Sequence, residues 1–422
     1  NTTQGTFSPY GPNWSNYFNG STDYLSIAST ALLALGAGDF TVEWWNYLSA
    51  ATLPTNVTVF DQRNGTNGQS IFQPVMEITS ADGLSWYVGA ANRISSSASA
   101  IKFYTFQHFA VSRTSGTTKM FIDGVQVGSS YVDSNNYPAG SIYIGKANDG
   151  SSARYFPGYI SNFRIVIGTS QYTSNFTPST TPLTAIANTS LLTCESNRFI
   201  DNSTNNLNIT KNGNVSVQRF SPFSPTQAYS AGTIGGSGYF DGTGDFLTAP
   251  SDAAFNVGNT WTVECWYYSV SRSNAYPCII SVTNGNYTNS IVLFDRHALA
   301  STKFSFAVGS SALNSGTTNV VNGTWYHIAL VSNNGVVTMY VNGTSEVTAN
   351  VTAGAVNKSV YIGANFDYAS YPSYLNGYIS NLRIVKSTAV YTSNFTPPTA
   401  PITAITNTSL LTNFTNAGII DN

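Results

Sequence analysis

Charged residues are scarce in this sequence. Only 9% of its 422 residues are charged, with 17 Lys and Arg against 19 Asp and Glu and a formal net charge of -2. We therefore expect no nucleic-acid partner, because such partners require clustered basic side chains. No apolar run approaches the roughly 20 residues needed to cross a bilayer, so we expect no membrane insertion. The sequence begins without Met and without a signal-peptide pattern, which predicts a processed product or a segment of a longer chain.

Cysteine is rare as well, and the three residues are Cys194, Cys265 and Cys278. Three cysteines are too few for a disulfide scaffold, and none shows the CxxC spacing typical of metal sites. A disulfide between Cys265 and Cys278 and a pair of buried free thiols both remain open.

Hydrophobic residues, by contrast, make up 42% of the chain and aromatic residues 14%, which is enough for a packed core. With so few charges, the surface must consist of Asn, Ser, Thr, Gly and Tyr. Thr and the aromatic residues suit pleated strands, whereas Asn and Gly suit turns, so the composition predicts a β-protein. Such a composition is also common in proteins that act outside cells.

An internal repeat organises the whole chain. The sequence GYISNFRIV at residues 158–166 returns as GYISNLRIV at residues 377–385, and YTSNFTP follows in both copies. YFNGSTDYL at residues 17–25 likewise returns as YFDGTGDFL at residues 239–247. A period of roughly 220 residues is far too long for a solenoid unit, so each copy is expected to be a complete domain.

Within each copy the pattern is one of short alternating strands. Phe40, Val42 and Trp44 share one face of an expected strand, and the residues between them share the other. The dipeptide Asp123-Gly124, matched by Asn-Gly in the second copy, separates apolar stretches as a two-residue hairpin turn would. No stretch shows sustained helical periodicity. We predict an all-β fold of two tandem jelly-roll β-sandwiches.

These motifs resemble the laminin-G-like branch of the concanavalin-A-like lectin/glucanase superfamily. The resemblance covers nearly the entire chain and rests on residues 240–242 (FDG), 262–264 (TVE), 325–331 (WYHIALV), 339–343 (MYVNG) and 377–384 (GYISNLRI). The closing YTSNFTP phrase, followed by NTSLLT, resembles the variant found in virion proteins of marine tailed phages. The resemblance implies lectin-like sandwich domains.

Paired carboxylates for catalysis are missing from the expected strands. The resemblance implies that a glycosidase of this superfamily would carry several acids on one strand, as its acid and nucleophile require. Glu43 and Glu264 each stand alone on their strands, so we expect no enzymatic activity. His108 and His327 recur at one place in the repeat, but no repeated Ser, Cys or Asp lies near them in sequence. We predict that these four side chains are buried and hydrogen-bonded.

Two acids in Gly-rich turns, Asp23 and Asp245, are candidate calcium ligands. A carboxylate and turn carbonyls suit Ca²⁺, and the resemblance implies that calcium at the rim of this fold is frequent. The other interpretation is an Asx-type turn, in which each carboxylate caps its own backbone. No cofactor is expected to be required, and Ca²⁺ is the metal to test.

Aromatic loops recur at one point of each repeat and are candidate glycan-binding sites. Their residues are Tyr155 and Phe156 in the first copy and Tyr371 and Tyr374 in the second. Exposed aromatic rings beside polar groups are typical of sugar-binding surfaces. The alternative is that these rings cover the edge of the sandwich.

The resemblance also implies that each domain opens with a Ser-Leu-Leu strand. This predicts domain 1 at residues 1–188, domain 2 at residues 189–407, and an unpartnered opening strand at residues 408–422. Because the sequence starts at the equivalent of Asn214, domain 1 is expected to lack its opening strand. Asn422 aligns with Asn202 and Asn1 with Asn214, so only residues 203–213 lack a counterpart elsewhere in the sequence.

An unpartnered strand and an incomplete domain predict assembly. Leu410, Leu411, Ile419 and Ile420 of residues 408–422 would complete domain 1 of the next copy, building a head-to-tail filament. Two alternatives are a longer array of identical repeats and a tail that folds back on its own domain 1.

The expected function is non-enzymatic. We predict an extracellular or virion-surface structural protein, such as a fibre, filament or appendage subunit, with possible adhesion to cell-surface glycans. One alternative is a carbohydrate-binding module of a larger polypeptide. A glycoside hydrolase or lyase is the other alternative, and it would need carboxylates from distant strands.

Overall fold

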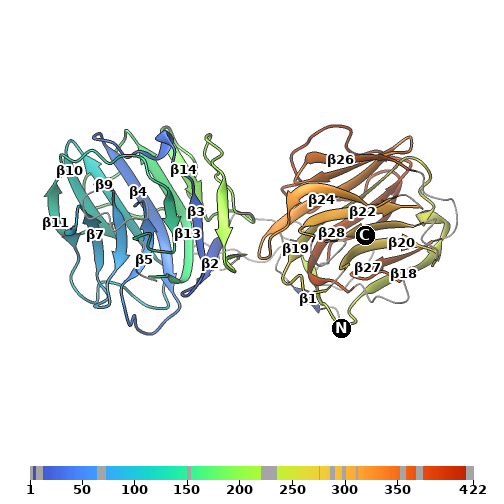
Figure 1. Ribbon diagram of the computed structural model, residues 1–422, viewed down its shortest axis with the longest axis horizontal. Coiled ribbons are helices and arrows are strands. Elements are labelled where there is room, and N and C mark those ends of the chain that lie inside the picture. Colours follow the sequence, from blue (N-terminus) through green and yellow to red (C-terminus); the bar gives the residue numbers. More distant parts are fainter. Residues whose placement is uncertain are drawn as a thin grey trace. The chain divides into compact units, whose positions relative to one another are not determined.

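The computed structural model describes residues 3–5, 13–63, 73–149, 154–219, 235–274, 276–285, 290–296, 301–309, 312–351, 358–366 and 374–414. The chain divides into two compact units, shown in Figure 1. Domain 1 comprises residues 12–227, and domain 2 comprises residues 228–422 together with residues 1–11. The only helices of the described residues are two short 3-10 turns, at Ala31–Leu33 and Ala253–Phe255. None of these described helices could span a membrane.

The larger sheet of domain 1 has eight strands in the described part of the chain. They are β2 (Ser15–Asn19), β4 (Phe40–Leu48), β9 (Gln107–Thr114), β10 (Thr117–Ile122), β11 (Val125–Val132), β13 (Pro157–Ile167), β14 (Thr189–Thr193) and β16 (Ser216–Gln218). Their order is β11-β10-β9-β4-β13-β2-β16, with β14 also paired to β13.

The smaller sheet of domain 1 packs against it. Its strands are β3 (Tyr24–Ile27), β5 (Val57–Asp61), β6 (Val75–Ile78), β7 (Leu84–Val88), β8 (Ala91–Ser95), β12 (Ile142–Ile144) and β15 (Ile209–Asn212). Their order is β15-β3-β12-β5-β6-β7-β8.

Domain 2 repeats this architecture. Its larger sheet has β1 (Thr3–Gly5), β17 (Ser237–Asp241), β19 (Trp261–Ser269), β24 (Trp325–Asn333), β25 (Val336–Val341), β26 (Thr344–Asn350), β28 (Asn376–Lys386) and β29 (Thr408–Thr412). The order is β1-β17-β28-β19-β24-β25-β26, with β29 also paired to β28.

In the described residues, the smaller sheet of domain 2 has one strand fewer than the smaller sheet of domain 1. It has β18 (Leu247–Asp252), β20 (Cys278–Thr283), β21 (Ile291–Phe294), β22 (Lys303–Val308), β23 (Asn314–Asn319) and β27 (Lys358–Ile362), in the order β18-β27-β20-β21-β22-β23. Every described strand of domain 1 except β15 has an equivalent strand in one of the two sheets of domain 2. The positions for which the sequence offers no counterpart are therefore those of β15 and its flanks, and among the described strands β18 is an edge.

A single apolar core lies between the two sheets of each domain. In domain 1, Phe40, Val42 and Trp44 of β4 are fully buried and belong to one cluster with Phe60 and Trp86 of the smaller sheet. The Phe40 and Trp86 rings stack with centroids 6.0 Å apart. The predicted all-β fold of two tandem jelly-roll sandwiches is confirmed.

The predicted hairpin turns are also present. Asp123 and Gly124 join β10 to β11 with φ of 51° and 78°, the left-handed conformation of a two-residue hairpin turn. The YTSNFTP segment folds onto this turn, where the Phe176 amide donates to the Gly124 carbonyl at 2.9 Å. A Cβ on Gly124 would lie 1.9 Å from the Phe176 carbonyl oxygen, so only glycine fits.

The predicted boundary at residues 188/189 is wrong. β14 pairs with β13, β15 with β3 and β16 with β2, so residues 189–218 close domain 1 instead of opening domain 2. The physical reason is burial: Leu191 lies in the core of domain 1, and Leu192 packs against Trp45 on the outer side of β4. Domain 1 therefore has every strand of the repeat.

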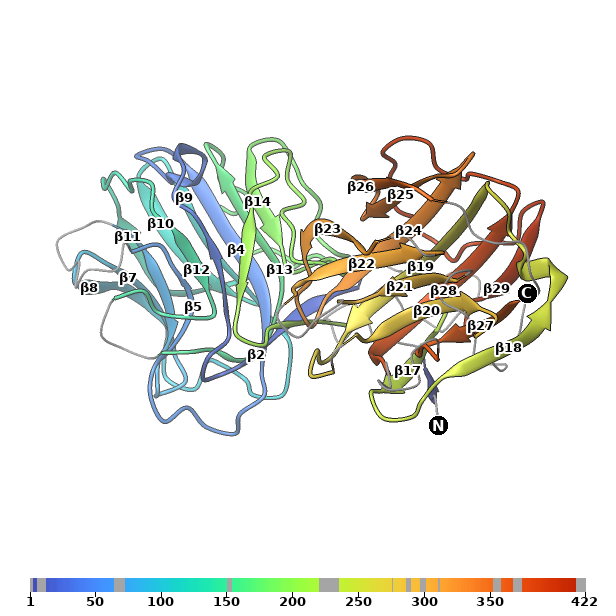
Figure 2. The same cartoon turned by 45° about the vertical axis from the view of Figure 1, so that its right-hand side comes forward.

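Residues 408–422 were expected to be unpartnered, and this is wrong for the part that the structure describes. β29 pairs with β28 of its own domain, as Figure 2 shows, and Leu410 lies in the core of domain 2. Leu411 is 1% exposed and pairs with Arg383. Strand donation by β29 would remove apolar side chains from its own core. Ile419 and Ile420 lie outside the described residues.

All three cysteines are buried and free. Of the two alternatives for Cys265 and Cys278, the structure has the pair of buried thiols. Burial raises the pKa of Cys265, which keeps its thiol protonated and unreactive.

Candidate functional site

The titratable residues that recur in the repeat form a buried network. In domain 1, the Arg164 guanidinium donates to Glu43 Oε1 from Nε at 2.9 Å, and the Tyr172 hydroxyl donates to Oε2 at 2.7 Å. His108 Nε2 lies 3.3 Å from the same Oε2. The Glu43 side chain is 0% exposed and that of His108 is 1% exposed. The carboxylate and the imidazole are therefore shielded from solvent.

Domain 2 carries the same network around Glu264. Arg383 Nε donates to Glu264 Oε1 at 2.9 Å, and His327 Nε2 lies 3.2 Å from Oε2. Burial raises the pKa of Glu264, but the hydrogen bond and charge of His327 and the charge of Arg383 outweigh it, and the pKa stays below its ordinary value. The prediction that these Glu and His side chains are buried and hydrogen-bonded is confirmed. The network ties neighbouring strands of the larger sheet together.

Asp23 caps a turn between β2 and β3. Its Oδ2 accepts from the Asn19 amide at 3.2 Å, and its Oδ1 accepts from the Thr22 hydroxyl at 3.1 Å. Oδ1 also accepts from the amide of Asn214 at 2.7 Å, which holds the segment before β16 against the turn. The carboxylate is 0% exposed.

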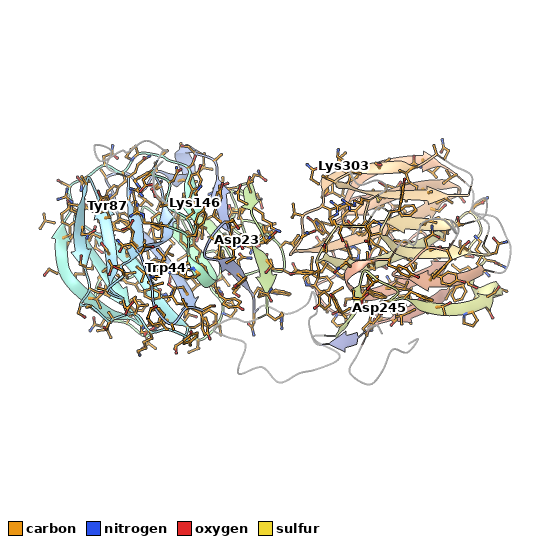
Figure 3. The ribbon with its side chains drawn as sticks, turned by 60° about the horizontal axis from the view of Figure 1, so that its bottom comes forward. Asp23, Trp44, Tyr87, Lys146, Asp245 and Lys303 are labelled. Atoms are coloured by element: carbon orange, nitrogen blue, oxygen red, sulfur yellow. The ribbon has the colours of Figure 1, made fainter. Side chains whose placement is uncertain are left out.

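Asp245 occupies the equivalent turn of domain 2, marked with Asp23 in Figure 3. Its Oδ2 accepts from the Asp241 amide at 3.3 Å. Both acids cap backbone of their own turn, but each accepts from the backbone amide four residues back. The Asx-type turn itself is made by Asn19 and Asp241, which accept from the backbone amides of Ser21 at 2.9 Å and Thr243 at 2.7 Å. In the described part of the chain, no three His, Cys, Asp or Glu side chains form a group that could hold a metal.

The structure brings aromatic side chains together on the outer face of the smaller sheet of domain 1. Leu25 of β3 points into the core, so its neighbour Tyr24 points outward and stacks on Tyr143 of β12, with centroids 5.8 Å apart and planes at 26°. Tyr155 lies 6.4 Å from Tyr24. The Lys146 ammonium, labelled in Figure 3, is 4.5 Å from the Tyr24 centroid. We call Tyr24, Tyr143, Tyr155 and Lys146 patch 1.

Domain 2 has an aromatic cluster at the equivalent place. Phe246 lies 6.3 Å from Tyr361 of β27 and 4.9 Å from Phe366, and Phe366 lies 6.4 Å from Tyr374. Phe246 is 37% exposed and Phe366 is 41% exposed, which is unusual for phenylalanine. We call Phe246, Tyr361, Phe366 and Tyr374 patch 2.

The sequence-based candidates for glycan binding are placed unequally. Tyr155 and Tyr374 belong to patches 1 and 2. The prediction that Phe156 binds glycans is wrong, because Phe156 is 0% exposed and packs on Phe18 in the core, with ring centroids 6.3 Å apart. Tyr371 lies outside the described residues.

Sequence reasoning missed six patch residues: Tyr24, Tyr143, Lys146, Phe246, Tyr361 and Phe366. A signal for two of them was present, since β12 reads Ile-Tyr-Ile and β27 contains Val-Tyr-Ile. Strand alternation places the middle Tyr on the face opposite its two apolar neighbours. Phe366 gave no such signal, because it follows β27 in a loop.

A charged network adjoins patch 1. Asp61 is paired with Tyr143 across the strands, and both of its carboxylate oxygens accept from Arg63 Nε at 3.0 Å. Arg154 donates to both Glu77 and Asp149. Burial raises the pKa of Glu77 despite the charge of Arg154.

Every carboxylate of this network contacts an arginine. Domain 2 has Ser281 and Phe294 in place of Asp61 and Glu77, as the strand registers show. Patch 1 therefore lies beside two carboxylates, Asp61 and Glu77, that have no equivalent beside patch 2.

A family comparison agrees with the fold. Residues 19–170 and 241–390 both match a laminin G family described as the concanavalin A-like lectin/glucanases superfamily. The chain belongs to the concanavalin A-like lectin/glucanases superfamily. The two matched regions correspond to the two sandwiches, and the predicted resemblance to this superfamily is confirmed. No curated protein matches the chain.

Several solved structures are similar. Domains LG4-5 of the mouse laminin alpha1 chain share 12% identity over 92% of this chain and 94% of theirs, with a TM-score of 0.29. A putative carbohydrate binding protein from Bacteroides ovatus shares 13% identity over 74% of each chain, with a TM-score of 0.35. Domain 4 of the arabinanase AbnA from Geobacillus stearothermophilus, bound to arabinotriose, shares 21% identity over 39% of this chain and 76% of its own, with a TM-score of 0.31. These likenesses concern the fold alone.

Proposed function

We propose that this superfamily member binds glycans through patches 1 and 2 and has no catalytic activity. The observation that carries the proposal is the recurrence of a partly exposed aromatic cluster at one place in both domains. Neither cluster belongs to the apolar core of its domain. Aromatic rings kept at a surface without a role in the core are typical of binding sites.

The chemistry of the patches suits sugars. One face of a sugar ring is lined with C–H groups and packs on the flat face of an aromatic ring, while its hydroxyls bond to nearby polar groups. In patch 1 the Tyr hydroxyls, the Lys146 ammonium and the outward Ser26 hydroxyl, which accepts from Asn212 at 3.0 Å, supply such groups. Patch 2 is more apolar, so the two domains are expected to prefer different glycans.

A role in attachment outside cells or on a virion surface follows from the same features. The uncharged surface rich in Asn, Ser, Thr, Gly and Tyr supports this placement, as 9% charged residues leave little else to face the solvent. Two binding domains in one chain would add avidity on a glycan-covered surface, even where each site is weak.

Replacing Tyr143 or Tyr361 with alanine is expected to weaken binding by the altered domain roughly two- to tenfold. Loss of one stacked ring costs about 0.5–1.5 kcal/mol, and 1.4 kcal/mol corresponds to tenfold in affinity. Affinity electrophoresis in gels containing laminarin, agar or alginate measures the effect. Tyr104→Ala is the matched control, because Tyr104 is 55% exposed and belongs to neither patch.

The polysaccharide that retards the protein should not be cleaved by it. Equal retardation of the wild type and both patch variants would contradict the proposal. So would turnover of any of these polysaccharides.

Calcium is expected to leave the melting temperature unchanged, because Asp23 is buried and accepts bonds from its own turn. An ion held only by the native state, at 100 times its Kd, would stabilise it by about 2.7 kcal/mol and raise Tm by several degrees. Calorimetry with added Ca²⁺ and with EDTA measures this. A rise in Tm that is lost in Asp23→Asn would show instead that Asp23 is a calcium ligand.

A further inference from the structure

The strand that closes the larger sheet comes from a different part of the chain in each domain. In domain 1, β16 pairs antiparallel with β2, and Ser216 lies opposite Tyr17. In domain 2, β1 pairs antiparallel with β17, and Thr3 lies opposite Tyr239. Tyr17 and Tyr239 are equivalent positions of the repeat, so β1 occupies the same place in the same register as β16. Figure 2 shows β1, in dark blue, beside β17.

Each closing strand also precedes the first strand of the other domain in sequence. β16 ends at Gln218 and the chain then runs to β17, while β1 ends at Gly5 and the chain then runs to β2. The segment that closes one domain is thus the segment that leads into the next one. A β1 strand from a second copy would meet β17 with the same partners and in the same direction.

β16 is held in domain 1 by more than its pairing with β2. β15 precedes it and pairs with β3, and the Asn214 amide donates to buried Asp23 at 2.7 Å. Val215 and Val217 are 0% exposed. The pairings of β1 and β16 each cover three residues, but β1 is joined in sequence to β2 of domain 1 and not to a strand of domain 2. β16 is therefore continuous in sequence with the domain that it closes, whereas β1 is not.

We propose that the β17 edge of domain 2 is a strand-acceptor site whose exchangeable occupant is the β1 strand of a second copy of this chain. Main-chain hydrogen bonds to a sheet edge supply the affinity, as in other cases of strand addition. The contact joins two different surfaces, so repeating it links copies head to tail and does not close on itself unless the rotation does. Its donor is the N-terminal strand, in contrast to residues 408–422.

The protein concentration decides whether β17 pairs with β1 of its own chain or with β1 of a second copy. The connection between β1 and β17 of one chain runs through the whole of domain 1, so the effective concentration of β1 at β17 is at most the roughly millimolar value that short linkers give. Linked copies are therefore expected to increase as the protein concentration approaches that range. Closure within one chain is expected in dilute solution.

Cysteine pairing at this edge tests the proposal on the full chain. Thr3→Cys and Tyr239→Cys are made in separate preparations, one of them isotopically labelled, and then mixed and oxidised at increasing concentration. We expect a disulfide between residues 3 and 239 of differently labelled copies, identified by mass spectrometry, with a yield that rises with concentration. The three native cysteines are buried and give little background.

The matched control uses the equivalent pair of domain 1, Ser216→Cys and Tyr17→Cys, and should give no cross-link between copies. Absence of the link between residues 3 and 239 of different copies would overturn the proposal. A double variant, Thr3→Cys with Tyr239→Cys, then shows whether β1 is paired at all. A link found only within single chains means that the strand stays with its own domain 2.

Discussion

Replacing Glu264 with alanine is expected to lower the free energy of unfolding of domain 2 by about 3–5 kcal/mol, because it leaves the buried guanidinium of Arg383 without its carboxylate. The variant also removes the acceptor of the Tyr391 hydroxyl, which donates to Glu264 Oε2 at 2.8 Å. Two-domain chains do not unfold in one step, so the effect is best read from hydrogen exchange on peptides of β19 and β4. Exchange should accelerate in β19 and stay unchanged in β4.

Glu43→Ala is the matched control, and it should reverse this pattern. The pH dependence supplies a second readout. The pKa of Glu264 is lowered from 4.5 in the folded state, so its contribution is fully present above pH 4.5 and is lost as the pH falls through the folded pKa. Domain 2 of Glu264→Ala should therefore lose less stability on acidification than domain 2 of the wild type. Equal acid sensitivity would contradict the assignment of this network as a stabilising one.

Replacing Gly343 with alanine is expected to cost about 3 kcal/mol in domain 2. Gly343 has φ of 80°, and a Cβ there would lie 1.8 Å from the Phe395 carbonyl oxygen. A left-handed alanine alone costs about 1–2 kcal/mol, and displacing Phe395 breaks the bond from its amide to the Gly343 carbonyl, worth about 1 kcal/mol. Hydrogen exchange on peptides of β25 and β26 measures the loss.

Gly258→Ala is the control in the same domain. Gly258 has φ of 69°, but a Cβ there would meet nothing within 4 Å, so only the conformational cost of about 1–2 kcal/mol applies. Equal losses in the two variants would mean that the YTSNFTP segment does not rest on the hairpin turn.

Much of the fold could be predicted from the sequence, because the same pattern of strands and turns occurs in both copies of the repeat. Alternation at Phe40, Val42 and Trp44 set the buried face of β4, and Asp123-Gly124 set a hairpin turn. The burial of Glu43 was predictable too, since no other acid accompanies it on its strand. Its Tyr172 partner was not predictable, because the two lie far apart in the sequence.

The domain boundary could not be predicted, since a repeat has the same period wherever it is cut. The sequence does not show whether residues 189–218 open the second copy or close the first. Burial of Leu191 in the core of domain 1 shows that they close it. Similarly, Tyr155 and Phe156 are neighbours in sequence, but Tyr155 lies at the surface and Phe156 in the core. The sequence does not show which of the two points inward.

A glycan microarray probed with the full chain tests the central claim most directly. Wild type should bind a limited set of glycans, and a Tyr143→Ala/Tyr361→Ala double variant of unchanged hydrogen exchange in β4 and β19 should lose them. Tyr104→Ala should bind as the wild type does. Undiminished binding by the double variant, or no binding by the wild type, would contradict the account of patches 1 and 2 as glycan sites.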